Sequence, residues 1–310
     1  MGHPSARPSP PLLRGPRVDE AELRDAPRLL ARMRAQLAAP DYKPPMLPAT
    51  ALQVHALSRR PEVTVQKLLE VLERDPMLAA DVLRRASAAD VAGRNRPKSL
   101  RDATLRLGTR GLGAFVLEVA LTGRVFRVPG LEVPMRELQE HSALVAACAR
   151  AVAIHAEVDD PDAAELAGLL HDVGIAAGLH LMGSVAAGRA APIEMLAEMA
   201  RGYGAEAGRI VAATWALPAE IASAVAHHDD PVFVQTRPDG AQVESWDVVA
   251  ACITLANAIA LALVQSPSPF ARALGAVSER GTADALHVLG LTPDDVDVVR
   301  EQMAGTRPVG

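Results

Sequence analysis

Two residues that can hold a divalent cation stand side by side in this sequence, at His171 and Asp172. They follow leucines at helical spacing, which predicts that the helix before them has one buried face. Asp160 is suited to cap the start of that helix and Pro161 to be its first residue, and Gly174 is expected to end it. An imidazole nitrogen and a carboxylate oxygen are ligands for divalent metals, but two ligands do not make a site.

A third candidate ligand, His141, lies upstream of this pair. It belongs to a stretch, residues 136–156, in which certain residues recur at alternating spacings of three and four: Leu138, His141, Val145, Cys148, Val152 and His155. This spacing predicts an amphipathic helix with His141 on its buried side. We therefore expect a buried histidine from one helix to meet the His-Asp pair at the end of another.

A histidine followed about a helix and a loop later by His-Asp resembles the opening of the metal site in the HD superfamily of phosphohydrolases. The resemblance becomes more specific in the segments 46–123, 214–231 and 253–261. Their motifs occur in the order expected of the HDOD family, the HD-related output domain of bacterial signalling proteins. Several independent motifs in one order make the match specific, and it covers residues 45–265.

The resemblance also shows where this chain departs from catalytic members of the superfamily, which complete the metal site with a late aspartate. The matching position here is Asn257, and an amide without the negative charge of a carboxylate is a poorer ligand for a hard divalent metal. Ile175 stands where active relatives have a lysine, so a cationic contact to substrate phosphate is missing. We expect Asn257 to be hydrogen-bonded to a His or Asp at the position of the superfamily's metal site.

Two adjacent histidines, His227 and His228, resemble the paired histidines that the HD-GYP branch uses as extra metal ligands. His228 is expected to point inwards, on the same helix face as Ile221 and Val225. The GYP run itself is absent after Pro231. The sequence therefore lacks the best support for cleavage of cyclic dinucleotides, and we predict that this activity is absent.

Three interpretations of the polar residues stay open: a remnant polar core, a site that binds a divalent metal ion without turnover, and a working phosphohydrolase. We interpret the site as degenerate and assign no catalytic residue. The candidate remnant metal site consists of His141, His171, Asp172, His227, His228 and Asn257.

The HDOD resemblance implies a function for the chain as a whole. It implies a non-enzymatic signal-transduction output or scaffold module, which binds a partner signalling protein or a small-molecule ligand between its lobes. The alternative is a metal-dependent phosphohydrolase acting on a nucleotide or another phosphate ester.

The composition favours a helical protein with a large core. The chain has 310 residues, of which 49% are hydrophobic and 3% aromatic, with alanine and leucine prominent. A formal net charge of -5 gives no reason to expect nucleic acid as a partner. The uncharged run at 248–264 is short for a bilayer and rich in alanine, so we expect a core helix and no membrane span.

The expected location is cytoplasmic. Cys148 and Cys252 both fall among apolar helical residues, which indicates buried, reduced thiols and not a disulfide framework. The first residues are rich in proline and lack the apolar core of a signal peptide.

The fold expected is all-α, with an N-terminal bundle of about five helices packed on an HD-like helical lobe. Thr64, Asp75-Pro76 and Ser99 are predicted to start helices of the first lobe, Gly108 to end one, and Thr292-Pro293 to start the last helix of the chain. The predicted units are a disordered tail at 1–17, a helix and linker at 18–43, the N-terminal helical lobe at 44–130, the HD-like lobe at 131–265 and closing helices at 266–310.

Two other groups of residues receive a structural interpretation. His55 has no acidic or histidine neighbour in the sequence, so we interpret it as a helix-face or core histidine. Arginines at 24, 28, 32 and 34 could contact an acidic partner or membrane phosphate, but the acidic residues between them favour a solvated helix face.

Overall fold

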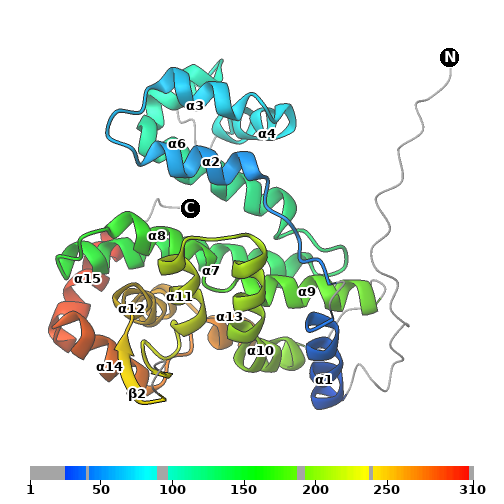
Figure 1. Ribbon diagram of the computed structural model, residues 1–310, viewed down its shortest axis with the longest axis vertical. Helices are drawn as coiled ribbons and strands as arrows, with labels where there is room; N and C mark the ends of the chain where they lie inside the picture. The colour runs from blue at the N-terminus through cyan, green and yellow to red at the C-terminus, as the bar shows by residue number, and fades with distance from the viewer. Residues whose placement is uncertain (1–24, 40–41, 89–96, 187–192, 237–239, 307–310) are drawn as a thin grey trace.

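The computed structural model describes residues 25–39, 42–88, 97–186, 193–236 and 240–306 (Figure 1). The predicted tail at 1–17 and the start of the predicted first helix lie outside these residues. The helices are α1 (Ala26–Leu37), α2 (Ala49–Ser58), α3 (Val65–Leu72), α4 (Pro76–Ala86), α6 (Leu100–Arg124), α7 (Glu132–His155), α8 (Pro161–Leu170), α9 (Val173–Ala186), α10 (Ile193–Thr214), α11 (Ala219–His227), α12 (Val248–Leu263), α13 (Pro269–Leu274), α14 (Glu279–Leu289) and α15 (Pro293–Thr306). The strands are β1 (Val232–Thr236) and β2 (Gln242–Trp246). The all-α prediction is confirmed.

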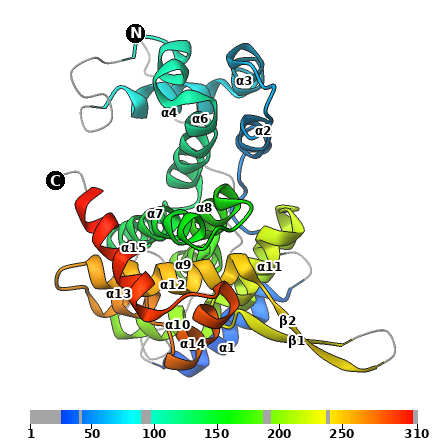
Figure 2. The same cartoon turned by 90° about the vertical axis from the view of Figure 1, so that its left-hand side faces the viewer.

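The helices form two lobes (Figure 1 and Figure 2). In the upper lobe of Figure 1, α2, α3 and α4 pack on α6. The lower lobe contains α7 to α15, with α12 packed against α7, α8, α11 and α14. α1 packs on α10 of the lower lobe, where Arg34 Nε lies 3.1 Å from the Glu206 carboxylate. The first described helix therefore belongs to the lower lobe, although the upper lobe follows it in the chain.

Side chains cap several helices at the residues that the sequence predicts. Thr64 Oγ1 accepts a hydrogen bond of 3.2 Å from a backbone N–H in the first turn of α3, and Asp160 accepts one of 3.0 Å in α8. Asp75 and Ser99 act in the same way for α4 and α6. Each cap satisfies an N–H that the helix itself leaves unpaired, so these predicted starts are confirmed.

Two glycines shape the helices of the two lobes. Gly108 interrupts the helix as predicted, with φ 74° and ψ 170°, but α6 resumes directly after this kink. The prediction that Gly174 ends the His-Asp helix is wrong, because α8 ends at Leu170 and Gly174 lies in the first turn of α9. A Cβ on Gly174 would collide with the backbone of Gly204 and Gly208, so the glycine permits α9 to pack closely on α10.

The apolar helices lie in the core of the lower lobe. Within the described residues one stretch, Pro161–Gly183, is long and apolar enough to cross a membrane by length and composition alone. The same stretch is 83% buried inside the protein over its most apolar window, which is the environment of a core helix. α12 is a shorter apolar helix, and it is buried along most of its length.

A β-hairpin that the sequence analysis does not predict joins α11 to α12 (Figure 2). Its strands are antiparallel, with Val232 opposite Trp246, and it extends away from the lower lobe. Gly240 has a φ of 82°, a value that glycine adopts without steric cost. The alternating β-branched residues of β1 are typical of a strand, but this pattern is only a few residues long.

The connection between α6 and α7, which contains the predicted boundary between residues 130 and 131, is packed against the lower lobe. Val128 is buried and fills the space beside Gly183 of α9. His180 Nε2, also on α9, donates a hydrogen bond to the carbonyl oxygen of Val125. The lower end of α6 is therefore held by α9.

Candidate metal centre

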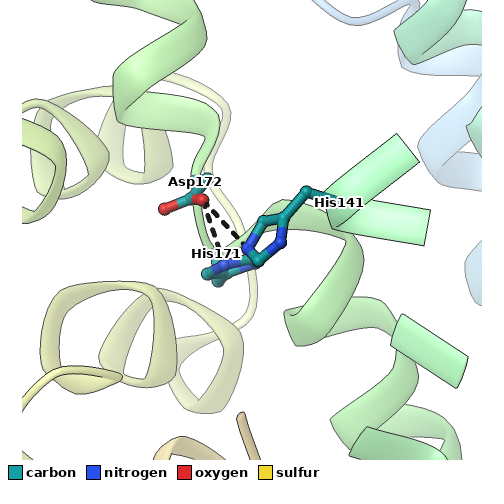
Figure 3. Close-up of side chains that lie close together, drawn as sticks. All are labelled: His141, His171 and Asp172. Atoms are coloured by element: carbon teal, nitrogen blue, oxygen red, sulfur yellow. Dashed lines mark ion pairs between the residues drawn. The ribbon is translucent and has the colours of Figure 1, made fainter. Parts of the chain in front are cut away.

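Polar side chains from four elements lie together in the core of the lower lobe. His141 comes from the middle of α7, His171 and Asp172 from the junction of α8 and α9, His228 from the end of α11 and Asn257 from α12. Figure 3 shows His141, His171 and Asp172 pointing towards one another. His171 is completely buried, and Asp172, His228 and Asn257 are at most 4% exposed. The sequence-predicted meeting of His141 with the His-Asp pair is present in the structure.

Asp172 is the centre of this cluster. Its Oδ2 lies 3.1 Å from His171 Nε2 and 3.6 Å from His141 Nε2. Its Oδ1 lies 3.8 Å from His228 Nε2. The ligand atoms of His141, His171 and Asp172 all lie within 4.8 Å of one another. One carboxylate is thus surrounded by three imidazole rings.

Backbone carbonyls orient two of the rings. His171 Nδ1 donates a hydrogen bond of 2.8 Å to the carbonyl oxygen of Gly168, and His228 Nδ1 donates one of 2.9 Å to that of Val225. Both rings consequently turn Nε2 towards Asp172. This is the arrangement that fixes the tautomer of a metal-binding histidine, because the outer nitrogen is already bonded.

The inward-facing atoms of the cluster are buried and have no hydrogen-bond partner among the residues that the structure describes. They are His141 Nε2, His171 Nε2, Asp172 Oδ2 and Asn257 Oδ1. Asn257 is close enough to His141 to favour its protonated form, although its Oδ1 is not aligned for a hydrogen bond. Two nitrogen and two oxygen atoms without partners fit a divalent cation, which would satisfy them together. A shared proton between His171 and Asp172 is the other way to satisfy the pair.

Burial and mutual contact move the pKa values of the cluster apart. Burial lowers the pKa of His141, Asp172 opposes this shift and His171 adds to it, so that the pKa is about 4. Burial opposes the charged form of Asp172, but the adjacent histidines outweigh it and hold its pKa at about 2. Burial likewise opposes a charged His171, yet the Asp172 carboxylate raises the pKa of this ring. The cluster therefore contains an ion pair, His171 with Asp172, beside a neutral His141.

His227 does not join the other predicted ligands. Its ring is stacked on Phe233 of β1, with centroids 3.8 Å apart and an interplanar angle of 1°. Its Nδ1 lies 3.3 Å from Ser223 Oγ, on the same face of α11. Adjacent residues of a helix point in directions about 100° apart, so His228 and His227 cannot both face the core. Of the six candidates the structure brings five together.

Two cavities flank the cluster. One of about 510 Å³ is lined by Asp172, Ile175, His228 and Asp229 among others. The other, of about 330 Å³, is lined by His141 and includes the carboxylates of Glu137 and Glu140. Among the described residues that line either cavity there is no lysine or arginine. Both approaches to the cluster are thus acidic.

Two residues that support the cluster were missed from the sequence. Asp229 Oδ1 lies 3.5 Å from His228 Nε2. Thr254 Oγ1 donates a hydrogen bond to the backbone carbonyl of His228 and so holds the end of α11 against α12. Thr254 precedes Asn257 by three residues, which places both on one face of α12, and this spacing could have found it.

The comparisons with known proteins support one family. The family model of the HDOD domain matches residues 45–231. Among curated proteins, none matches the sequence.

Several crystal structures share the fold. An HDOD domain protein of unknown function from Geobacter sulfurreducens has a TM-score of 0.61 at 19% identity, with 93% of this chain and 95% of that chain covered. A candidate metal-dependent phosphohydrolase from Shewanella amazonensis has a TM-score of 0.55 at 19% identity, with 90% and 99% covered. A candidate signal transduction protein from Marinobacter aquaeolei has a TM-score of 0.55 at 22% identity, with 92% and 62% covered. At these identities the likeness shows the fold and not the activity.

Proposed function

The chain belongs to the HDOD family, and we propose that it is a non-enzymatic output module of bacterial signal transduction, built around a degenerate HD metal site. In this proposal the polar cluster holds the lower lobe together, and the two lobes jointly form the surface that binds a partner.

The charge around the cluster is the observation that carries this proposal. Asp172 is the buried carboxylate of the cluster, and Asn257, which is uncharged, stands where an active relative has an aspartate. A phosphate ester is an anion, and its hydrolysis is accelerated by cationic groups that neutralise the negative charge on the transferred group and on the leaving oxygen. The described residues lining the flanking cavities include Glu137, Glu140 and Asp229 but no lysine or arginine. The approaches therefore repel the substrate that an HD hydrolase would bind.

A divalent cation would be held by His141, His171 and Asp172, with Asn257 as a neutral oxygen donor. A bound cation supplies Lewis acidity and lowers the pKa of a coordinated water. Asp172 is the only carboxylate among these four ligands, so the ligands carry little negative charge to offset that of the cation. We accordingly expect weak metal binding, with the carbonyls of Gly168 and Val225 orienting the rings whether or not metal is present.

A metal-dependent phosphohydrolase acting on a nucleotide or another phosphate ester is the second candidate. The four buried atoms without hydrogen-bond partners favour it, because a cation would satisfy all of them. The similarity in fold to the candidate phosphohydrolase from Shewanella amazonensis is consistent with it.

A signalling protein or a small ligand placed between the lobes is the partner we propose. The lobes meet through ion pairs of Arg59 with Asp160 and of Arg110 with Asp162, the second at 3.1 Å. A few polar contacts of this kind stabilise one arrangement only weakly, so binding can change how the lobes are placed.

Metal analysis of the purified protein, followed by a phosphatase screen that includes cyclic di-GMP, tests the function. We expect no hydrolysis that scales with protein concentration, with or without added Mn²⁺ or Mg²⁺. Hydrolysis that scales with the protein and disappears in His171→Ala would refute the non-enzymatic assignment and favour the second candidate.

A further inference from the structure

A cavity of about 310 Å³ lies between the lobes and involves none of the residues of the metal cluster. Residues of α2 and α6 line it from the upper lobe, and residues of α7 and α8 line it from the lower lobe. Figure 2 shows the lower half of α6 descending towards α7 and α8. Its lining is mainly apolar and includes Leu107, Phe115, Leu117, Leu166 and Leu169. The volume is at the small end of the range for ligand pockets, and a ligand held here would touch both lobes.

His55 of α2 is the polar side chain of this cavity that lacks hydrogen bonds. Both ring nitrogens are buried, and neither has a hydrogen-bond partner within the described part of the chain. The backbone of Gly113 comes close enough to favour a protonated ring, but its geometry is not that of a hydrogen bond. Buried polar groups are normally paired, because leaving them unpaired costs free energy. A bound molecule would restore what the protein does not supply.

The His55 ring is neutral. Burial is the main cause that lowers its pKa, and Arg59, one turn further along the helix, lowers it further. A neutral imidazole offers one donor and one acceptor, so it can bind a polar group that is itself uncharged. This differs from His171, whose ring is paired with the Asp172 carboxylate.

The charged groups of the cavity already have partners. Asp162 lies 3.1 Å from Arg110 and 3.4 Å from Arg150, and Glu165 lies 3.5 Å from the same Arg150. Glu118 completes the acidic lining and also has a partner. Because these carboxylates already have partners, the described lining offers no isolated charge of either sign to attract an anion or a cation.

We propose that this interlobe cavity binds a small uncharged organic ligand, with an apolar body in the leucine-lined space and a polar group hydrogen-bonded to His55. This inference deepens the proposed function, because it names the class of ligand held between the lobes. Binding would alter how α2 and α6 sit on α7 and α8, and so alter the surface offered to a partner.

Benzamide is a suitable probe, with benzoate and benzylamine as anionic and cationic molecules of similar shape. Ligand-detected NMR and isothermal titration of the full chain give the affinity of each. We expect saturable binding of benzamide and at least about tenfold weaker binding of both charged probes. Equal binding of all three, or no saturable binding of benzamide, would overturn the proposal.

Variants locate the site. His55→Leu keeps the apolar volume and removes both polar atoms, and we expect it to weaken benzamide binding about tenfold, while His55→Gln restores a donor and an acceptor. Ala143→Leu adds bulk to the cavity from an exposed position on α7 and should block binding without touching His55. His287→Leu, at an exposed position on α14, is the matched control and should bind as the wild type does. Unchanged binding in both His55→Leu and Ala143→Leu would show that benzamide binds elsewhere.

These outcomes are separate from those that test the proposed function. A phosphatase activity lost in His171→Ala would overturn the non-enzymatic assignment and leave the cavity result standing. Failure of benzamide to bind would remove the uncharged ligand class and leave the absence of turnover standing.

Discussion

Buried histidines occur in both regions of the molecule, the core of the lower lobe and the boundary between the lobes, but their surroundings differ. His171 has the Gly168 carbonyl on one ring nitrogen and the Asp172 carboxylate beside the other, and its pKa is raised despite burial. Within the described part of the chain neither ring nitrogen of His55 has a hydrogen-bond partner, and burial lowers its pKa. The same side chain is therefore part of an ion pair in one region and a neutral, unpaired group in the other.

This difference indicates that the core of the lower lobe serves stability and that the boundary between the lobes is free to serve binding. In the lower lobe, the hydrogen bond to the Gly168 carbonyl and the charge pairing with Asp172 hold the His171 ring in one orientation, which contributes to a unique packed core. A buried polar group without partners lowers stability and is retained where another molecule can supply the bonds. The lower lobe is accordingly interpreted as a rigid core, and the boundary between the lobes as the place where a ligand acts.

The largest effect is expected from removing the centre of the cluster. Asp172→Ala leaves three buried imidazoles without their carboxylate, and we expect the free energy of unfolding to fall by about 3 kcal/mol. The loss is not larger because His171 can lose its proton and so relieve part of the cost. Urea unfolding measures the loss, and metal analysis of the same sample should show no bound metal. The matched control is Asp81→Ala in the exposed pair with Arg84, which should cost less than about 1 kcal/mol.

An equal, small loss in both variants would contradict the interpretation of the cluster as the core of the lobe. Metal that persists undiminished in Asp172→Ala would show that the ligands have been assigned wrongly.

His55→Leu should change the free energy of unfolding in the opposite direction. It replaces an unpaired polar ring in an apolar cavity with an apolar side chain, and we expect the free energy of unfolding to rise by up to about 1 kcal/mol. The same substitution at His171 should destabilise the protein, because it strands the Asp172 carboxylate in the core. Destabilisation by His55→Leu comparable to that of His171→Leu would indicate that His55 has a structural partner.

The smallest effect concerns pH. The pKa of His55 is lowered in the folded protein, so between that value and its ordinary value near 6.5 the unfolded chain binds more protons than the folded one. The free energy of unfolding therefore has its full value above about pH 6.5 and decreases as the pH falls below it, because protonation of His55 favours the unfolded chain. Urea titrations between pH 7.5 and 5.5 should show a shallower decline for His55→Leu than for the wild type. Identical slopes would mean that His55 is solvated in the folded protein.

The sequence predicted those features that depend on neighbouring residues. Thr64, Asp75 and Asp160 act as caps within one turn of their own helices, so their roles can be read locally. His141 and the His-Asp pair could be brought together because each has a helical pattern around it and the family resemblance relates them. The substitution at Asn257 was visible for the same reason.

Features that depend on packing between distant segments could not be predicted in this way. Gly174 was interpreted as a helix stop because nothing nearby in the sequence shows that α9 lies against the backbone of Gly204. His55 received a structural interpretation because its acidic neighbour Asp162 is more than 100 residues away in the chain. His227 was grouped with His228 because the two resemble the paired histidines of the HD-GYP branch, whereas the direction of each side chain on α11 separates them.

Whether the metal site is degenerate can be tested by comparing the wild type with Asn257→Asp in a metal-loaded phosphodiesterase assay, with bis-p-nitrophenyl phosphate and Mn²⁺. The substitution restores the missing carboxylate beside His141, so we expect the purified protein to contain more metal. We also expect no efficient turnover, because the two cavities that flank the cluster still lack a lysine or arginine among their described residues. Efficient hydrolysis by Asn257→Asp, absent again when His171→Ala is added, would contradict the account and show a catalytic site disabled by one residue.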